Sequence, residues 1–211
     1  MIIAVFSVLF ISLLMSIPIA VSLGMASIVG LYSLSPELLV LAPQKFLTGI
    51  NSFTLLAIPM FILAGTIMGS GGIAARIVNF CLIFVGRVKG GLGFVVILAT
   101  MFFSGVCGSA SADTAAIGST TMPEMLKRKY PKPFATALLA ASGATASIIP
   151  PSIDLIIIGI VSGISIGGLF AAGILPGIFN AVALMCLCFY FSKKLDLPVT
   201  EKTTLGEKFK I

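Results

Sequence analysis

Apolar runs alternate along the chain with short polar or glycine-rich interruptions. Because about 20 apolar residues cross a bilayer as a helix, this pattern predicts a bundle of membrane helices. The runs that predict helices cover residues 2–23, 53–68, 73–85 and 168–192. Pro18 is expected to kink the first of them, since proline removes a helical hydrogen bond.

Two features organise the chain before residue 92. Residues 37–51 mix polar and apolar positions around Lys45, and they predict an amphipathic segment at the membrane interface. The glycine-rich stretch 69–72 interrupts the apolar pattern. We therefore divide this part of the chain into N-terminal scaffold helices at 1–52 and helices that lead to the next segment at 53–91.

The stretch over residues 92–126 is apolar apart from Asp113 and Glu124, and basic residues flank it on both sides. Since cytoplasmic loops collect lysine and arginine, both of its ends are expected in the cytoplasm. Two full crossings with a turn would need about 40 residues or more. The stretch therefore predicts a re-entrant helical hairpin with its tip at 107–113. Two short tilted spans are the alternative.

Small residues dominate the predicted tip: glycine, alanine, serine and threonine supply fourteen of the eighteen residues at 104–121. A turn there frees carbonyl groups from the first arm and N–H groups from the second. The carbonyls suit a hard cation such as Na⁺, and the N–H groups suit a carboxylate. Asp113 is either the N-cap of the second arm or an ion ligand. The residues assigned to the substrate side of the tip are Ser109, Ser111, Asp113 and Thr114.

Residues 133–163 predict one long crossing that Pro150 and Pro151 interrupt. Two adjacent prolines remove two backbone donors, so the helix is expected to open and to leave the carbonyls at 146–149 without partners. Ser152 would then cap the second half-helix, with Asp154 in its first turn. A simple kink is the alternative.

Three smaller patterns have structural interpretations. Glycines recur every four residues in two runs, which indicates close helix packing: Gly159, Gly163 and Gly167, and then Gly173 and Gly177. The cysteines form no CxxC pair and are expected to be small buried residues, at Cys81, Cys107, Cys186 and Cys188. Residues 193–211 are polar and predict a cytoplasmic tail or a truncated linker.

Composition supports the membrane interpretation and excludes several kinds of chemistry. The chain is 58% hydrophobic and 9% charged, against about 25% charged residues in soluble domains. Its mean hydropathy is +1.19. The chain has no histidine, which excludes imidazole metal sites and serine–histidine catalysis. The sequence also lacks a phosphate-binding loop, and the net charge of +6 does not indicate nucleic acid. We therefore expect an all-α polytopic membrane protein with lipid contacts, and not an enzyme.

Three segments resemble the large membrane subunit of tripartite ATP-independent periplasmic (TRAP) transporters, the DctM-like family. They are IPMFILAGTIMGSGGIAARIVNF at 58–80, FFSGVCGSASADTAAIGS at 102–119 and IIPPSIDLIIIG at 148–159. The resemblance implies one half of an inverted-repeat elevator transporter in a bacterial inner membrane. It implies Na⁺-driven import of organic acids, of the C4-dicarboxylate or sialic-acid type.

The resemblance also implies partners and ion ligands. The partners are a small four-helix membrane subunit and a periplasmic substrate-binding protein. The Na⁺ ligands would be Gly108, Ser109, Ser147, Ile149 and Pro150. Members of the family have a second, inverted half, so a C-terminal half of the permease is expected as a further partner. A channel-like subunit or a membrane scaffold without transport activity is the alternative function.

Overall fold

The computed structural model describes residues 2–51, 53–86 and 88–198. Within those ranges the regular elements are ten α-helices and two 3₁₀ helices, so the all-α prediction is confirmed. The chain forms two compact units, with the boundary at residue 53.

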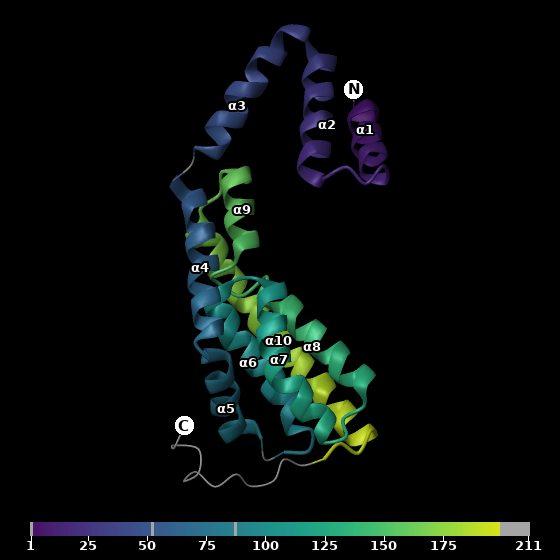
Figure 1. Cartoon of the computed structure of the whole chain (residues 1–211), viewed down its shortest axis with the longest axis vertical. Coiled ribbons are helices and arrows are strands. Elements are labelled where there is room, and N and C mark those ends of the chain that lie inside the picture. The colour runs from purple at the N-terminus through teal and green to yellow at the C-terminus, as the bar shows by residue number, and fades with distance from the viewer. Residues whose placement is uncertain (1, 52, 87, 199–211) are drawn as a thin grey trace. The chain divides into compact units, whose positions relative to one another are not determined.

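The first unit begins with a helical hairpin (Figure 1). Its helices are α1 (Ile2–Leu14), α2 (Ile19–Leu34), η1 (Pro36–Val40) and α3 (Leu41–Ile50). The prediction of one kinked helix over 2–23 is wrong. Ser16 adopts the left-handed conformation with φ 59°, and the Ile17 N–H donates to the Ser12 carbonyl at 3.1 Å. This hydrogen-bond pattern ends a helix, and Pro18 then precedes α2, which packs back against α1.

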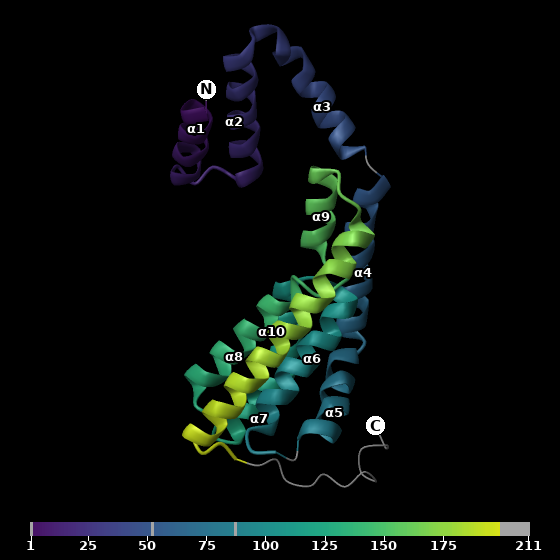
Figure 2. The ribbon, with the colours of Figure 1, turned by 180° about the vertical axis from the view of Figure 1, so that it is seen from behind.

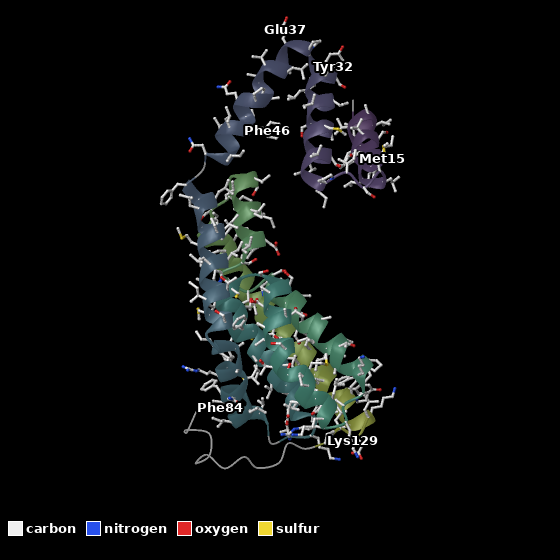
Figure 3. The ribbon with its side chains drawn as sticks, in the orientation of Figure 1. Met15, Tyr32, Glu37, Phe46, Phe84 and Lys129 are labelled. Atoms are coloured by element: carbon white, nitrogen blue, oxygen red, sulfur yellow. The ribbon has the colours of Figure 1, made fainter. Side chains whose placement is uncertain are left out.

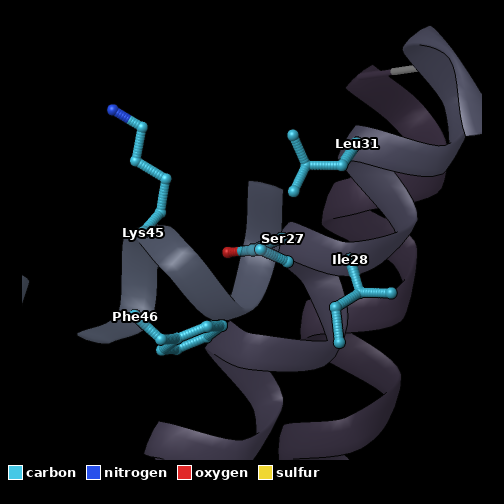
Figure 4. Close-up of a pocket in the computed structure, with 6 residues that line it drawn as sticks. Ser27, Ile28, Leu31, Lys45 and Phe46 are labelled. Carbon is cyan, nitrogen blue, oxygen red and sulfur yellow. The ribbon is translucent and has the colours of Figure 1, made fainter. Parts of the chain in front are cut away.

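The amphipathic segment of the first unit is helical in η1 and α3. A hollow of about 210 Å³ lies between α2 and α3, with Ser27 and Leu31 on one side and Lys45 and Phe46 on the other (Figure 4). Large apolar side chains also point outward from this unit, as Met15 does with 70% of its surface exposed (Figure 3). Such exposure is typical of a surface that faces lipid or another protein.

The second unit surrounds α6 with other helices (Figure 2). After η2 (Phe53–Leu56) its helices are α4 (Ala57–Ser70), α5 (Ile73–Val85), α6 (Gly91–Cys107), α7 (Ala110–Lys127), α8 (Lys132–Ala146), α9 (Ile153–Ser162) and α10 (Ile166–Lys194). Helix α6 contacts α4, α5, α7, α8 and α10, and most of its side chains are buried. The predicted hairpin at 92–126 corresponds to α6 and α7, which lie side by side.

Two pairs of helices in this unit run end to end. Helices α4 and α5 follow one line in both views, with Gly72 at φ 75° between them (Figures 1 and 2). Helices α8 and α9 likewise continue in one general direction across residues 147–152. Each pair is therefore one interrupted path along the unit and not a hairpin.

Helix α10 has the packing expected inside a membrane. Its buried positions are small or short, and they are Gly173, Gly177, Ala181, Cys188 and Ser192. Large apolar residues point outward instead, as Leu175 and Phe179 do with 77% and 75% of their surface exposed. Small residues at helix contacts and large apolar residues on the outside are the membrane pattern. Among the described residues, two helices are long and apolar enough to span a bilayer, Phe53–Ser70 and Ile166–Lys194.

Some smaller predictions need correction. Cys186 is exposed, whereas the other three cysteines are buried as expected. Gly163 does not pack against a neighbouring helix, because it is the left-handed C-cap of α9 with φ 69°. At the start of the predicted polar tail, Leu197 is buried and Asp196 pairs with Lys89 at 3.0 Å. The rest of that tail, residues 199–211, lies outside the described residues.

Candidate functional site

The turn between α6 and α7 consists of only Gly108 and Ser109. Gly108 adopts φ 65°, and an added Cβ would meet the Pro151 carbonyl oxygen. Glycine is required there both by backbone conformation and by the close approach of another segment. The turn is shorter than the predicted tip, because Ser111, Asp113 and Thr114 already lie in the first turns of α7.

The second element is the interruption between Ala146 and Ile153, where the Pro150–Pro151 peptide bond is cis. Ser152 holds its two sides together. Its hydroxyl donates to the Ser147 carbonyl at 2.6 Å and accepts from the Leu155 N–H at 3.4 Å, so it is the N-cap of α9. Asp154 lies in the first turn of α9 with its side chain exposed.

The hairpin turn and the helix interruption are in direct contact. The Ile153 N–H, at the start of α9, donates to the Gly108 carbonyl at 3.2 Å. One turn earlier in α6, the buried Ser104 hydroxyl donates to the Ala146 carbonyl, the last of α8, at 2.8 Å. Two segments that are about 40 residues apart in sequence therefore form one site.

Some carbonyl groups at the interruption accept hydrogen bonds and others do not. The Ala146 and Ser147 carbonyls, which the sequence predicted to be free, accept hydrogen bonds from serine hydroxyls. Among the described residues, no donor reaches the carbonyls of Ile149, Pro150 and Pro151. Within the described residues the carbonyls at 148 and 149 are therefore free as predicted, those at 146 and 147 are not, and free acceptors continue through the two prolines.

Asp113 is the one fully buried carboxylate in the described part of the chain. The N-cap interpretation of Asp113 is wrong, because Ser109 holds the N-cap position of α7 and Asp113 lies four residues further on. The Cys107 thiol is near enough to Asp113 to interact, yet neither carboxylate oxygen has a hydrogen bond of good geometry. A buried, unpaired carboxylate is costly, which makes Asp113 a candidate functional residue.

The remaining predicted residues surround the turn. The Ser109 and Ser111 hydroxyls lie 3.4 Å apart. The Thr114 hydroxyl donates to the Ala110 carbonyl at 2.6 Å, and Gly143 of α8 packs directly against Thr114. Of these residues, Thr114 faces α8 one turn before the interruption, whereas Asp113 lies beside Cys107 of α6.

Sequence reasoning missed the third wall of the site, which α10 supplies. A Cβ on Gly173 would lie 2.5 Å from the Ile148 carbonyl oxygen, and Gly177 packs against the Ile149 side chain. The Asn180 amide donates to the Thr145 hydroxyl at 3.0 Å. The four-residue spacing of Gly173 and Gly177 indicated close packing, but nothing in it indicated which segment they contact.

The donor set of this site is carbonyl and hydroxyl oxygen. In the described ranges no three histidine, cysteine or acidic residues come together. Transition metals prefer imidazole or thiolate ligands, whereas hard cations prefer oxygen. Unwound carbonyls beside broken helices are the usual Na⁺ ligands in secondary transporters. The residues present therefore fit Na⁺.

Comparison with known proteins adds the decisive observation. Residues 6–210 match the family described as tripartite ATP-independent periplasmic transporter, DctM component. The chain belongs to this family. Membership confirms the resemblance seen in the sequence and the prediction of a polytopic membrane protein.

Three curated relatives illustrate the similarity. The 2,3-diketo-L-gulonate TRAP transporter large permease protein YiaN of Escherichia coli (strain K12) is 46% identical over 78% of this chain and 39% of its own length. The sialic acid TRAP transporter large permease protein SiaM of Vibrio cholerae is 44% identical over 80% and 40%. The C4-dicarboxylate TRAP transporter large permease protein DctM of Rhodobacter capsulatus is 34% identical over 97% and 50%. The chain thus spans half or less of these relatives, in their N-terminal half.

Proposed function

We propose that this chain supplies the N-terminal half of the large membrane subunit of a Na⁺-coupled TRAP-type importer of organic acids. The contact between the hairpin turn and the helix interruption supports the proposal best. It places free carbonyls, serine hydroxyls and the N-terminus of α9 beside each other. In this proposal the remaining half comes from a C-terminal part of the permease, since the matched relatives are about twice as long.

The names of the relatives and the chemistry of the site support an organic acid as substrate. Sialic acid, 2,3-diketo-L-gulonate and C4-dicarboxylates are all organic acids. The first turn of α7 suits a carboxylate, because the positive end of its helix dipole points there. In the first turn of α9 the Ile153 and Leu155 N–H groups already have acceptors, so α9 contributes mainly through its dipole. We assign Ser109, Ser111, Asp113 and Thr114 to the substrate side.

The proposed Na⁺ ligands come from both segments. Ile149 and Pro150 offer carbonyls that no described donor reaches, and Ser109 offers a hydroxyl. The Gly108 and Ser147 carbonyls each already accept one hydrogen bond and keep a second lone pair. Bound Na⁺ would join the two segments, so its binding would favour the closed contact between hairpin and interruption.

The proposed setting follows from the family. The partners are the small four-helix membrane subunit and a periplasmic substrate-binding protein, and the location is the inner membrane of a bacterium. Transport would use an elevator mechanism, in which the body that holds the site moves across the membrane with its substrate.

Uptake into proteoliposomes tests the function. The chain is reconstituted with the C-terminal half of a relative's permease, the small subunit and the binding protein of that relative. We expect uptake of the relative's organic acid only with an inward Na⁺ gradient, and Ser109→Leu should abolish it. Ser119→Leu is the matched control, because Ser119 lies further along α7 with its side chain exposed and its hydroxyl donates to the Ala116 carbonyl of its own helix. Uptake that ignores the Na⁺ gradient would contradict the proposal.

A further inference from the structure

Five exposed lysines gather at one end of the second unit, away from the transport site. Three lie at the turn between α7 and α8 and two at the end of α10, and both ends lie together in the two opposite views (Figures 1 and 2). Nitrogen atoms gather around the labelled Lys129 (Figure 3). We call this surface the basic end, and it consists of Lys127, Lys129, Lys132, Lys193 and Lys194.

Packing holds the two groups of lysines in place. Tyr130 is only 3% exposed and packs in the core cluster with Leu92 and Leu197, so the turn beside Lys129 is fixed to the helices below it. Burial raises the pKa of the Tyr130 hydroxyl to about 12, and the ring therefore stays uncharged. The rings of Phe134 and Phe191 lie 6.0 Å apart and join α8 to α10 close to both groups.

The positive charge of the basic end is not neutralised by the described part of the chain. The ion pairs near it are Arg128 with Glu124 at 2.7 Å and Lys89 with Asp196 at 3.0 Å. None of the five lysines has an acidic partner within the described ranges. Like charges held this close repel each other, so the surface favours an anionic partner.

Exposed aromatic residues adjoin the lysines and indicate what that partner is. Phe189 and Tyr190 are 49% and 59% exposed, and the Lys193 ammonium lies 4.4 Å from the centre of the Phe189 ring. Aromatic residues next to lysines are typical of the boundary between acyl chains and headgroups in a membrane. A soluble anion would use the charges and leave these rings exposed to water.

We infer that the basic end binds anionic phospholipids, with their phosphates on the lysines and their acyl chains along the aromatic residues of α10. Clusters of lysine beside a membrane helix attract anionic lipids in this way. This binding does not depend on the transport function or on which substrate the permease takes.

Native mass spectrometry of the 211-residue chain in detergent tests the inference. Phosphatidylglycerol and phosphatidylcholine are offered at equal concentration, and retained lipids are counted. We expect preferential retention of phosphatidylglycerol, and Lys193→Gln with Lys194→Gln should weaken it about 10- to 30-fold. The matched control is Lys45→Gln with Arg76→Gln, which removes the same charge elsewhere and should leave retention unchanged. Circular dichroism verifies that both variants keep their helices.

Three outcomes would overturn the inference. Equal retention of the two lipids would show that the headgroup charge is not recognised. Equal loss in both double variants would mean that net charge alone decides retention. If inorganic phosphate displaced phosphatidylglycerol completely, the surface would bind free anions and not lipid. Rising salt should weaken phosphatidylglycerol retention in the wild type, because salt screens exposed charges. The same salt should have little effect on the Lys193→Gln with Lys194→Gln variant, and this difference would support the inference.

Discussion

The second unit contains two interrupted helix paths, and they differ in what surrounds the interruption. Between α4 and α5, Gly72 turns the chain with φ 75° and an added Cβ there would meet nothing within 4 Å. Between α8 and α9, the interruption is enclosed by the α6–α7 turn on one side and by α10 on the other. Both interruptions free backbone groups, but only the second places them among other polar groups.

The comparison shows that a helix break is not by itself a site. At the α4–α5 break the chain simply ends one helix and begins another, with its backbone open to the surroundings. At the α8–α9 break, hydroxyls of Ser104 and Ser152 satisfy some carbonyls and leave those around Pro150 free. The selection of which carbonyls remain free is what creates a candidate ion site.

The largest difference between the two breaks is expected from their left-handed glycines. Gly108→Ala should destabilise the unit by about 2–4 kcal/mol, because the new Cβ strains the left-handed backbone and meets the Pro151 carbonyl. Gly72→Ala should cost only about 1–2 kcal/mol, since it has the backbone strain alone. Denaturant unfolding in detergent micelles measures both. Equal losses would mean that the close contact at Gly108 contributes nothing.

A second pair of glycines is expected to differ in the sign of the effect. Gly173→Ala should destabilise by about 1–3 kcal/mol, because its Cβ would lie 2.5 Å from the Ile148 carbonyl oxygen. Gly69→Ala should instead stabilise α4 by about 0.5–1 kcal/mol, since nothing lies within 4 Å and alanine favours the helix. The midpoints of thermal unfolding of the two variants should therefore move in opposite directions. A rise for both would exclude tight packing of α10 against the α8–α9 break.

The sequence predicted local interruptions well and their surroundings poorly. Proline and glycine act on their own backbone, so the breaks at Pro150 and Gly108 were visible without any knowledge of neighbours. The turn at Ser16 was missed because serine, unlike glycine or proline, does not indicate by its residue type that the backbone turns left-handed there. That turn divides one predicted helix into two.

Contacts between distant segments could not be predicted from the sequence for a different reason. Ser104 looked like any other small residue of the hairpin, and its bond to the Ala146 carbonyl depends on how two helices are placed. The position of Asp113 depended on a turn of two residues, where a longer one was expected. The resemblance to the family indicated that the hairpin and the broken helix form one site, but the structure was needed to show which of their groups are in contact.

The smallest expected difference between the breaks concerns serine hydroxyls at their edges. Ser152→Ala removes the N-cap of α9 and the donor to the Ser147 carbonyl, so we expect a loss of about 1–2 kcal/mol. Ser70→Ala, at the end of α4, removes a bond to the Ile67 carbonyl at an exposed position and should change stability by less than about 0.5 kcal/mol. Hydrogen exchange localises the effect, because α9 amides should lose protection in the first variant while α4 amides keep theirs in the second. Unchanged protection of α9 in Ser152→Ala would show that the contacts with Gly108 and α10 hold the interruption without its cap.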